Sequence, residues 1–123
     1  MAALSVQVFG TPDSQATRAA LRFFKERRID VHLVDVSRKP MAPTELRRFI
    51  DRLGARAIAD DASKAWRDAG FAYLRIDDAE LEQRLFTEQP LLKLPLVRFG
   101  NAVAVGRDEA AWKALIAAPV ASR

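Results

Sequence analysis

Ser14 and Arg18 place a hydroxyl and a guanidinium four positions apart near the N-terminus. Ser14 follows the chain break Gly10-Thr11-Pro12-Asp13 and opens an amphipathic segment. The free N–H groups and the dipole of a helix start favour an anion. Ser14 would therefore either cap the helix, which is the favoured interpretation, or donate a hydrogen bond to a bound thiol or thiolate. Arg18, one turn later on the same face, would either hold a carboxylate or phosphate or belong to a solvated basic surface.

The chain of 123 residues contains no cysteine, which excludes disulfide exchange, thiolate catalysis and thiolate metal sites. Its one histidine, His32, argues against a transition-metal site. A relay of Ser14, His32 and Asp35 is disfavoured, because the middle of a second strand is a poor position from which to reach the start of the first helix. The residues thus predict no metal site and no definite catalytic residue, and they leave open whether the protein is an enzyme.

The elements that must position Ser14 are predicted to be two strands joined by a helix. Residues 4–9 alternate apolar and polar side chains, as in a strand. From Ser14 to about Arg28, apolar residues recur at helical spacing. The apolar, β-branched run over residues 29–36 predicts an interior strand parallel to the first.

The rest of the chain is predicted to add helices and then a β-hairpin. Residues 43–89 read as an insertion of about three helices: one ends at Gly54, one spans residues 58–69, and one is capped by Asp77 or Asp78. Two apolar runs on either side of Gly100-Asn101, within residues 91–105, predict the hairpin, and a last helix carries Trp112. This order is the thioredoxin arrangement. We therefore expect one α/β domain over residues 1–123, with a four-stranded mixed sheet and helices on both faces.

Several motifs together resemble the arsenate reductase (ArsC)/Spx/YffB family over almost the whole chain. That family has a Gly-x-Pro-x-Cys stretch with an arginine four places after the cysteine. The matching stretches here are Gly10-Thr11-Pro12-Asp13-Ser14 with Arg18, Asp35 with Lys39-Pro40 and Glu45-Leu46, Trp66-Arg67, Pro90-Leu91-Leu92-Lys93-Leu94-Pro95-Leu96, and Val105-Gly106-Arg107-Asp108-Glu109-Ala110-Ala111-Trp112. The resemblance implies a thioredoxin-like fold. It also implies a cis peptide between Leu94 and Pro95 that faces the first helix and offers backbone groups to a peptide or to glutathione.

The departures from the family argue against arsenate reduction. Ser14 stands in place of the nucleophilic cysteine, and Leu94 replaces the arginine before the family's proline. The insertion's Asn-x-Arg falls by spacing on residues 60–62, where no arginine occurs. Of the family's oxyanion-binding arginines, only Arg18 and Arg107 remain. By resemblance, the expected ligand-binding residues are Thr11, Ser14, Arg18, Leu94, Pro95 and Arg107.

These observations predict a non-redox module that binds a protein or peptide, in a family whose Spx-type members bind RNA polymerase. The alternative is a glutathione-dependent transferase or reductase in which Ser14 orients the glutathione thiol, so glutathione is the one cofactor considered. The formal net charge is +4, with its basic excess in the first half of the chain, and this excess reads as a solvated helix surface. Direct nucleic-acid binding is not expected, because Phe23, Phe24 and Phe49 fall in apolar stripes. Without a leader or a membrane-length apolar run, we expect a cytoplasmic protein with no membrane partner.

Overall fold

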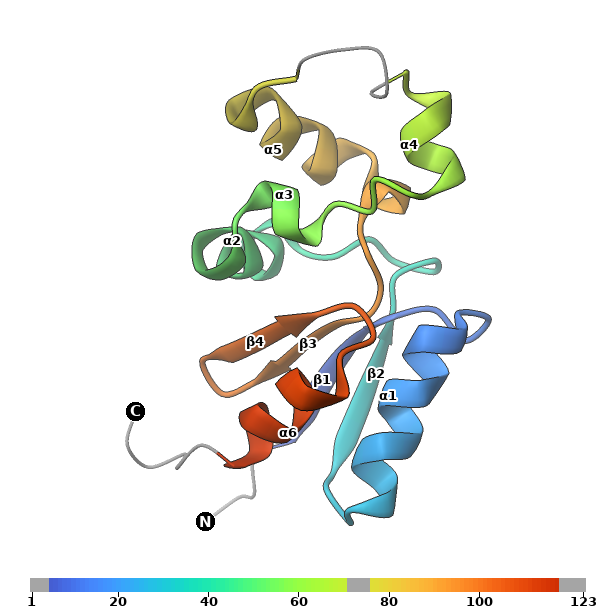
Figure 1. Cartoon of the computed structure of the whole chain (residues 1–123), viewed down its shortest axis with the longest axis vertical. Helices are drawn as coiled ribbons and strands as arrows, with labels where there is room; N and C mark the ends of the chain where they lie inside the picture. The colour runs from blue at the N-terminus through green and yellow to red at the C-terminus, as the bar shows by residue number, and fades with distance from the viewer. Residues whose placement is uncertain (1–4, 71–75, 118–123) are drawn as a thin grey trace. The chain divides into compact units, whose positions relative to one another are not determined.

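The computed structural model describes residues 5–70 and 76–117, which fall into two compact units (Figure 1). The sheet unit comprises residues 1–40 and 94–123, and the helical unit comprises residues 41–93. The predicted insertion, residues 43–89, lies within the helical unit.

The sheet unit is built on a four-stranded mixed sheet with the order β2-β1-β3-β4. Its strands are β1 (Val6–Gly10), β2 (Val31–Asp35), β3 (Leu96–Phe99) and β4 (Ala102–Val105). β1 pairs in parallel with β2 and antiparallel with β3, and β3 and β4 form the predicted hairpin. The mixed sheet and the α/β class expected from the sequence are therefore confirmed.

The position of β2 differs from the prediction, because it is an edge strand and not an interior one. It pairs with β1 alone, and none of its residues is fully buried. Val31 and Leu33 pack against the core on one side, whereas His32 is exposed. A β-branched run gives the period of a strand but not its neighbours, so the sequence could not separate an edge from a centre.

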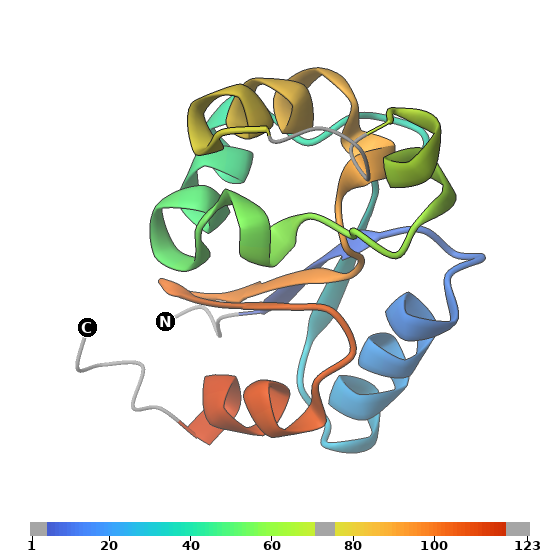
Figure 2. The same cartoon turned by 45° about the horizontal axis from the view of Figure 1, so that its top comes forward.

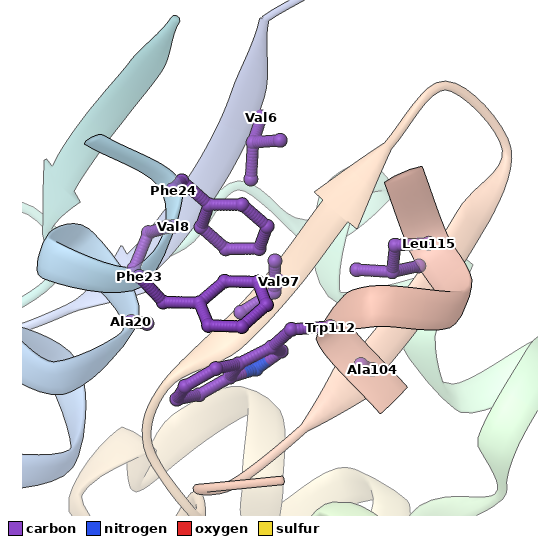
Figure 3. Close-up of a cluster of buried hydrophobic side chains, with 9 residues drawn as sticks. All are labelled: Val6, Val8, Ala20, Phe23, Phe24, Val97, Ala104, Trp112 and Leu115. Atoms are coloured by element: carbon purple, nitrogen blue, oxygen red, sulfur yellow. The ribbon is translucent and has the colours of Figure 1, made fainter. Parts of the chain in front are cut away.

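Two helices cover one face of the sheet and enclose the core of this unit. α1 (Gln15–Glu26) and α6 (Glu109–Ala117) lie on the same side of the sheet in Figure 2. Figure 3 shows the cluster between them, in which Trp112 is fully buried, 5.3 Å from Phe23 and 6.1 Å from Phe24 by ring centroids. The cluster also contains Val6, Val8, Ala20, Val97, Ala104 and Leu115. The helical spacing of Phe23, Phe24 and Trp112 in the sequence therefore does mark core positions.

The helical unit contains α2 (Pro43–Leu53), α3 (Ala55–Ile58), α4 (Lys64–Asp68), α5 (Asp78–Thr87) and the 3-10 turn η2 (Gln89–Leu91). α2 ends before Gly54, as predicted, and the Asp77 side chain caps α5 by accepting from the N–H of Glu80 at 2.8 Å. Leu46, Phe49, Leu81 and Leu85 are fully buried.

The single helix predicted over residues 58–69 is wrong, because the chain there forms the separate helices α3 and α4. Between them, Lys93 N–H donates to Ile58 and Asp60 N–H donates to Leu91, so this stretch is extended and pairs with residues 91–93. Ser63 then caps the new helix by accepting from Trp66 N–H at 3.1 Å. Pairing with a distant segment has overridden the local helical spacing.

Residues 91–94, predicted as part of the hairpin's first strand, also lie outside it, since β3 begins only at Leu96. Within the described parts of the chain, no helix is both long and apolar enough to cross a lipid bilayer.

Candidate functional site

The register of the sheet brings the predicted site residues to one end of the sheet unit. Gly10, at the end of β1, pairs with Asp35, and Phe9 pairs with Leu96 at the start of β3. Leu96 in turn pairs with Val105 at the end of β4. The segments just beyond these pairs are the Thr11–Ser14 loop, Leu94-Pro95 and Gly106-Arg107. Residues far apart in the sequence therefore share one end of the sheet, where polar groups at strand ends commonly form sites.

Ser14 is the N-cap of α1, as the favoured interpretation of the sequence predicted. Its Oγ accepts from the N–H of Thr17 at 3.1 Å, and its own N–H donates to the Thr11 carbonyl at 3.1 Å. The side chain is half-buried. One acceptor position of the hydroxyl is therefore used by the helix, while its hydrogen stays available to a ligand that accepts.

The β1–α1 junction is tightly packed, because Gly10 lies directly against Thr17. Thr17 is fully buried, and its Oγ1 accepts from the N–H of Thr11 at 3.4 Å. A Cβ on Gly10 would overlap Oγ1 and come within 2.7 Å of Cγ2. The glycine is thus required by a close approach of side chain to backbone, and it fixes where the Thr11–Ser14 loop leaves the sheet.

The peptide between Leu94 and Pro95 is cis, as the resemblance implied. Pro95 is buried, Leu94 is half-buried, and the Pro95 carbonyl accepts from the N–H of Gly106 at 2.8 Å. That hydrogen bond ties the start of β3 to the loop that carries Arg107. It also occupies one acceptor position of the Pro95 carbonyl.

Arg18 and Arg107 come together with Arg22 around an open hollow of about 240 Å³. The hollow is lined by Gln15, Arg18, Ala19 and Arg22 of α1 and by Arg107 of the β4–α6 loop. Arg18 also donates through Nη1 to the Pro12 carbonyl at 2.9 Å, which holds its side chain along the start of α1. Thr11, Ser14, Leu94 and Pro95 do not line this hollow.

No carboxylate neutralises this arginine-lined hollow within the described residues. The ion pairs between described residues are Arg47–Asp51, Arg47–Glu82, Arg48–Glu45, Arg56–Asp78, Lys64–Asp68 and Arg84–Glu88, all in the helical unit. Asp108 and Glu109 follow Arg107 in the sequence but do not pair with it, and Asp108 instead caps α6 through Ala111 N–H at 3.0 Å. Three guanidinium groups around one hollow raise its positive potential, which favours a bound anion.

The relay of Ser14, His32 and Asp35 is not formed. His32 lies exposed in the middle of the edge strand β2, whereas Ser14 hydrogen-bonds within its own helix. Asp35 accepts from the hydroxyl of Ser37 at 2.6 Å and from its N–H at 3.0 Å. These bonds, led by the one from the hydroxyl, hold the pKa of Asp35 below its ordinary value of 3.8 despite some desolvation. Across the described ranges, no group of three His, Asp or Glu side chains could hold a metal.

Gln15, Ala19 and Arg22 are the hollow's residues that sequence reasoning did not assign to a site. The available signal was spacing: Arg18 and Arg22 are four residues apart and so lie on one helical face. What spacing could not provide was Arg107, which joins that face from a loop 85 or more residues away.

Comparison with known proteins supports the same fold. The ArsC family profile matches residues 9–115. An arsenate reductase from Vibrio cholerae superposes with a TM-score of 0.78 at 19% identity, over 91% of this chain and 98% of that one. An arsenate reductase (ArsC) related protein from Brucella melitensis superposes with a TM-score of 0.69 at 17% identity, over 94% and 98% of the two chains. None of the curated proteins matches this chain significantly.

Proposed function

Since the chain belongs to the ArsC family and contains no cysteine, we propose that it is a non-redox member that binds a protein or peptide. The binding surface is the end of the sheet unit formed by the Thr11–Ser14 loop, α1 and the loop that carries Arg107. The observation that carries this proposal is the state of residue 14, a serine that caps α1.

A capping serine supports binding in preference to redox chemistry. Attack on arsenic or on a disulfide requires a nucleophile that is ionised or readily deprotonated. In the described structure, no histidine or carboxylate hydrogen-bonds to Ser14 as a general base, and the hydroxyl accepts from Thr17 N–H. We therefore expect no arsenate-dependent turnover with glutathione as the thiol source. Turnover that disappears in Ser14→Ala would contradict the proposal.

The charge of the α1 surface supports a partner as the ligand. Arg18 and Arg22 are exposed and take part in no ion pair among the described residues. Unpaired surface arginines contribute little to a fold, but they accelerate and stabilise association with an acidic partner. The basic face of α1 is therefore the expected contact.

Affinity capture under native conditions tests the proposal, with the wild-type chain and the Arg18→Glu/Arg22→Glu variant as baits. The control variant is Arg52→Glu, which reverses an exposed arginine of α2 in the helical unit. We expect at least one stoichiometric protein partner that the wild type and Arg52→Glu retain and the double variant loses. Identical sets of captured proteins for all three baits would overturn the proposed function.

The alternative is a glutathione-dependent transferase or reductase, and one observation favours it. The register of β1 and β3 puts Ser14 and Pro95 at the same end of the sheet unit, and the hydroxyl hydrogen of Ser14 is free of any described partner. A hydroxyl there could donate to the thiolate of bound glutathione.

Calorimetry and NMR with millimolar glutathione test this alternative. It predicts saturable heat and amide shifts around Ser14 and Pro95. It also predicts loss of binding in Ser14→Asp, a residue that caps helices but, when ionised, donates no hydrogen bond. Absence of both heat and shifts in the wild type would remove the alternative and leave the binding proposal standing.

A further inference from the structure

We infer that the partner offers an acidic protein segment whose carboxylates enter the hollow between Arg18, Arg22 and Arg107. This inference rests on the proposed binding function and specifies its ligand chemistry. It starts from a concave surface of the sheet unit that three guanidinium groups line together.

The three arginines line one hollow, and none of them forms an ion pair with a described residue. Arg18 and Arg22 extend from successive turns of α1, and Arg107 reaches the same surface from the β4–α6 loop. Glu26, one turn beyond Arg22, is the nearest acidic position along the helix, and it makes no ion pair with Arg22. A bound anion would reduce the mutual repulsion among the arginines, so binding and charge relief are coupled.

The side chains that line the hollow suit carboxylates carried by short aliphatic stems. Each guanidinium presents a planar fork of N–H donors that matches the two oxygens of a carboxylate. Gln15 adds an amide that can donate or accept, and Ala19 forms a small apolar surface for methylene groups.

The same surroundings disfavour a nucleic acid. The aromatic side chains of α1 are Phe23 and Phe24, only 5% and 0% exposed, so they are not available for stacking with bases. The hollow is also confined to one helix face and one loop, whereas nucleic-acid sites follow a phosphate backbone over a longer basic track.

The test uses fluorescence anisotropy of a labelled octaglutamate peptide with blocked ends. Wild-type protein is compared with Arg22→Ala, Arg107→Ala and the matched control Lys25→Ala, which removes the same charge from the same helix but does not line the hollow. We expect each arginine variant to raise Kd by roughly threefold to tenfold and Lys25→Ala by less than about twofold. Arg107→Lys, which keeps the charge but not the fork, should recover only part of the loss.

Amide NMR shifts on titration with the same peptide locate its binding site independently. We expect shifts at Gln15, Ala19, Gly106 and Arg107, and none at the C-terminal end of α1. Equal losses for all three alanine variants, no binding of octaglutamate up to millimolar concentration, or tighter binding of inorganic phosphate or a DNA oligonucleotide than of the peptide would each overturn the inference.

Octaglutamate competition in the capture experiment separates this inference from the proposed function. Partners that depend on Arg18 and Arg22 and are displaced by octaglutamate support both. Partners that depend on these arginines but are not displaced by octaglutamate would contradict the inference and leave the proposed function standing. If octaglutamate binds in the hollow while no partner is captured, the proposed function fails.

Discussion

The two units of this protein handle charge in opposite ways. From the sequence, the sheet unit has 11 lysines and arginines against 6 aspartates and glutamates, whereas the helical unit has 9 against 10. The ion pairs between described residues all lie in the helical unit. Charge in the helical unit is therefore mostly balanced by ion pairs within that unit, whereas the sheet unit carries a basic excess with no ion pair among its described residues.

This difference in charge pairing between the units indicates where a family member without a cysteine nucleophile could bind a ligand. Paired charges on a surface add little to stability, and their loss has small local effects. Unpaired like charges around a hollow weakly destabilise the free protein and are relieved by a ligand. The sheet unit should thus depend on its apolar core for stability and use its arginines for binding.

The largest effect should come from the core of the sheet unit. Trp112→Ala removes a fully buried side chain that contacts Phe23 and Phe24, and it should lower the free energy of unfolding by about 3–5 kcal/mol. Urea denaturation followed by circular dichroism measures this loss. The matched change in the helical unit, Trp66→Ala, removes a half-buried side chain and should cost clearly less. Equal losses of unfolding free energy in the two variants would contradict the expected difference between the units.

The next largest effect concerns the junction that positions the site. Gly10→Ala forces a Cβ against the buried Thr17 side chain and should cost about 1–3 kcal/mol of unfolding free energy. Thr17→Ala in the same chain should relieve the overlap, so the double variant should lose less than the two single losses combined. Gly54→Ala is the control from the helical unit. Its backbone φ is +90° and nothing lies within 4 Å of an added Cβ, so its cost should simply add to that of Thr17→Ala.

A smaller effect tests the charge comparison directly. Arg47→Ala in α2 removes a guanidinium that pairs with Asp51 and Glu82 and lies over the Phe86 ring, and it should cost about 0.5–1 kcal/mol of unfolding free energy. Arg22→Ala in α1 should cost nothing or stabilise slightly, because it lowers repulsion. Thermal melts at low and high salt distinguish the two variants, since salt screens surface charges and should reduce the difference between their melting temperatures. A larger loss for Arg22→Ala would refute the contrast between the units.

The smallest effect is a pH dependence at the end of β2. The hydrogen bond from the Ser37 hydroxyl lowers the pKa of Asp35, so ionised Asp35 favours the folded state. This contribution is present above the unfolded pKa and is lost as pH falls through the lower, folded value. Ser37→Ala should move the folded pKa of Asp35 up toward 3.8, as measured by NMR titration of its side-chain carboxyl carbon. Ser63→Ala, which removes a capping serine from α4, should leave it unchanged.

Local patterns predicted the elements that are stabilised locally. The cap at Ser14, the cap at Asp77 and the turn at Gly100-Asn101 are each specified by a few adjacent residues, and the structure contains all three. The failures have the opposite character. The sequence predicts a helix at Ala59 and Asp60, because periodicity does not reveal their pairing with residues 91–93. It predicts an interior β2, because strand order is a property of the whole sheet.

The residues of the candidate site were predictable where local motifs mark them, but their spatial arrangement was not. Ser14, Arg18, Pro95 and Arg107 were named from motifs, and the sheet register does bring their segments to one end. The arginine-lined hollow was not foreseen, because it requires a helix face and a distant loop to meet. The binding roles of these residues remain predictions.

The cap gives Ser14 a structural role that needs no chemistry. A neutral thiol at position 14 would be a weaker acceptor for the Thr17 amide than the Ser14 hydroxyl, which secures the first turn of α1. A serine there can persist without any selection for chemistry, and the surrounding surface is then free to acquire a new use.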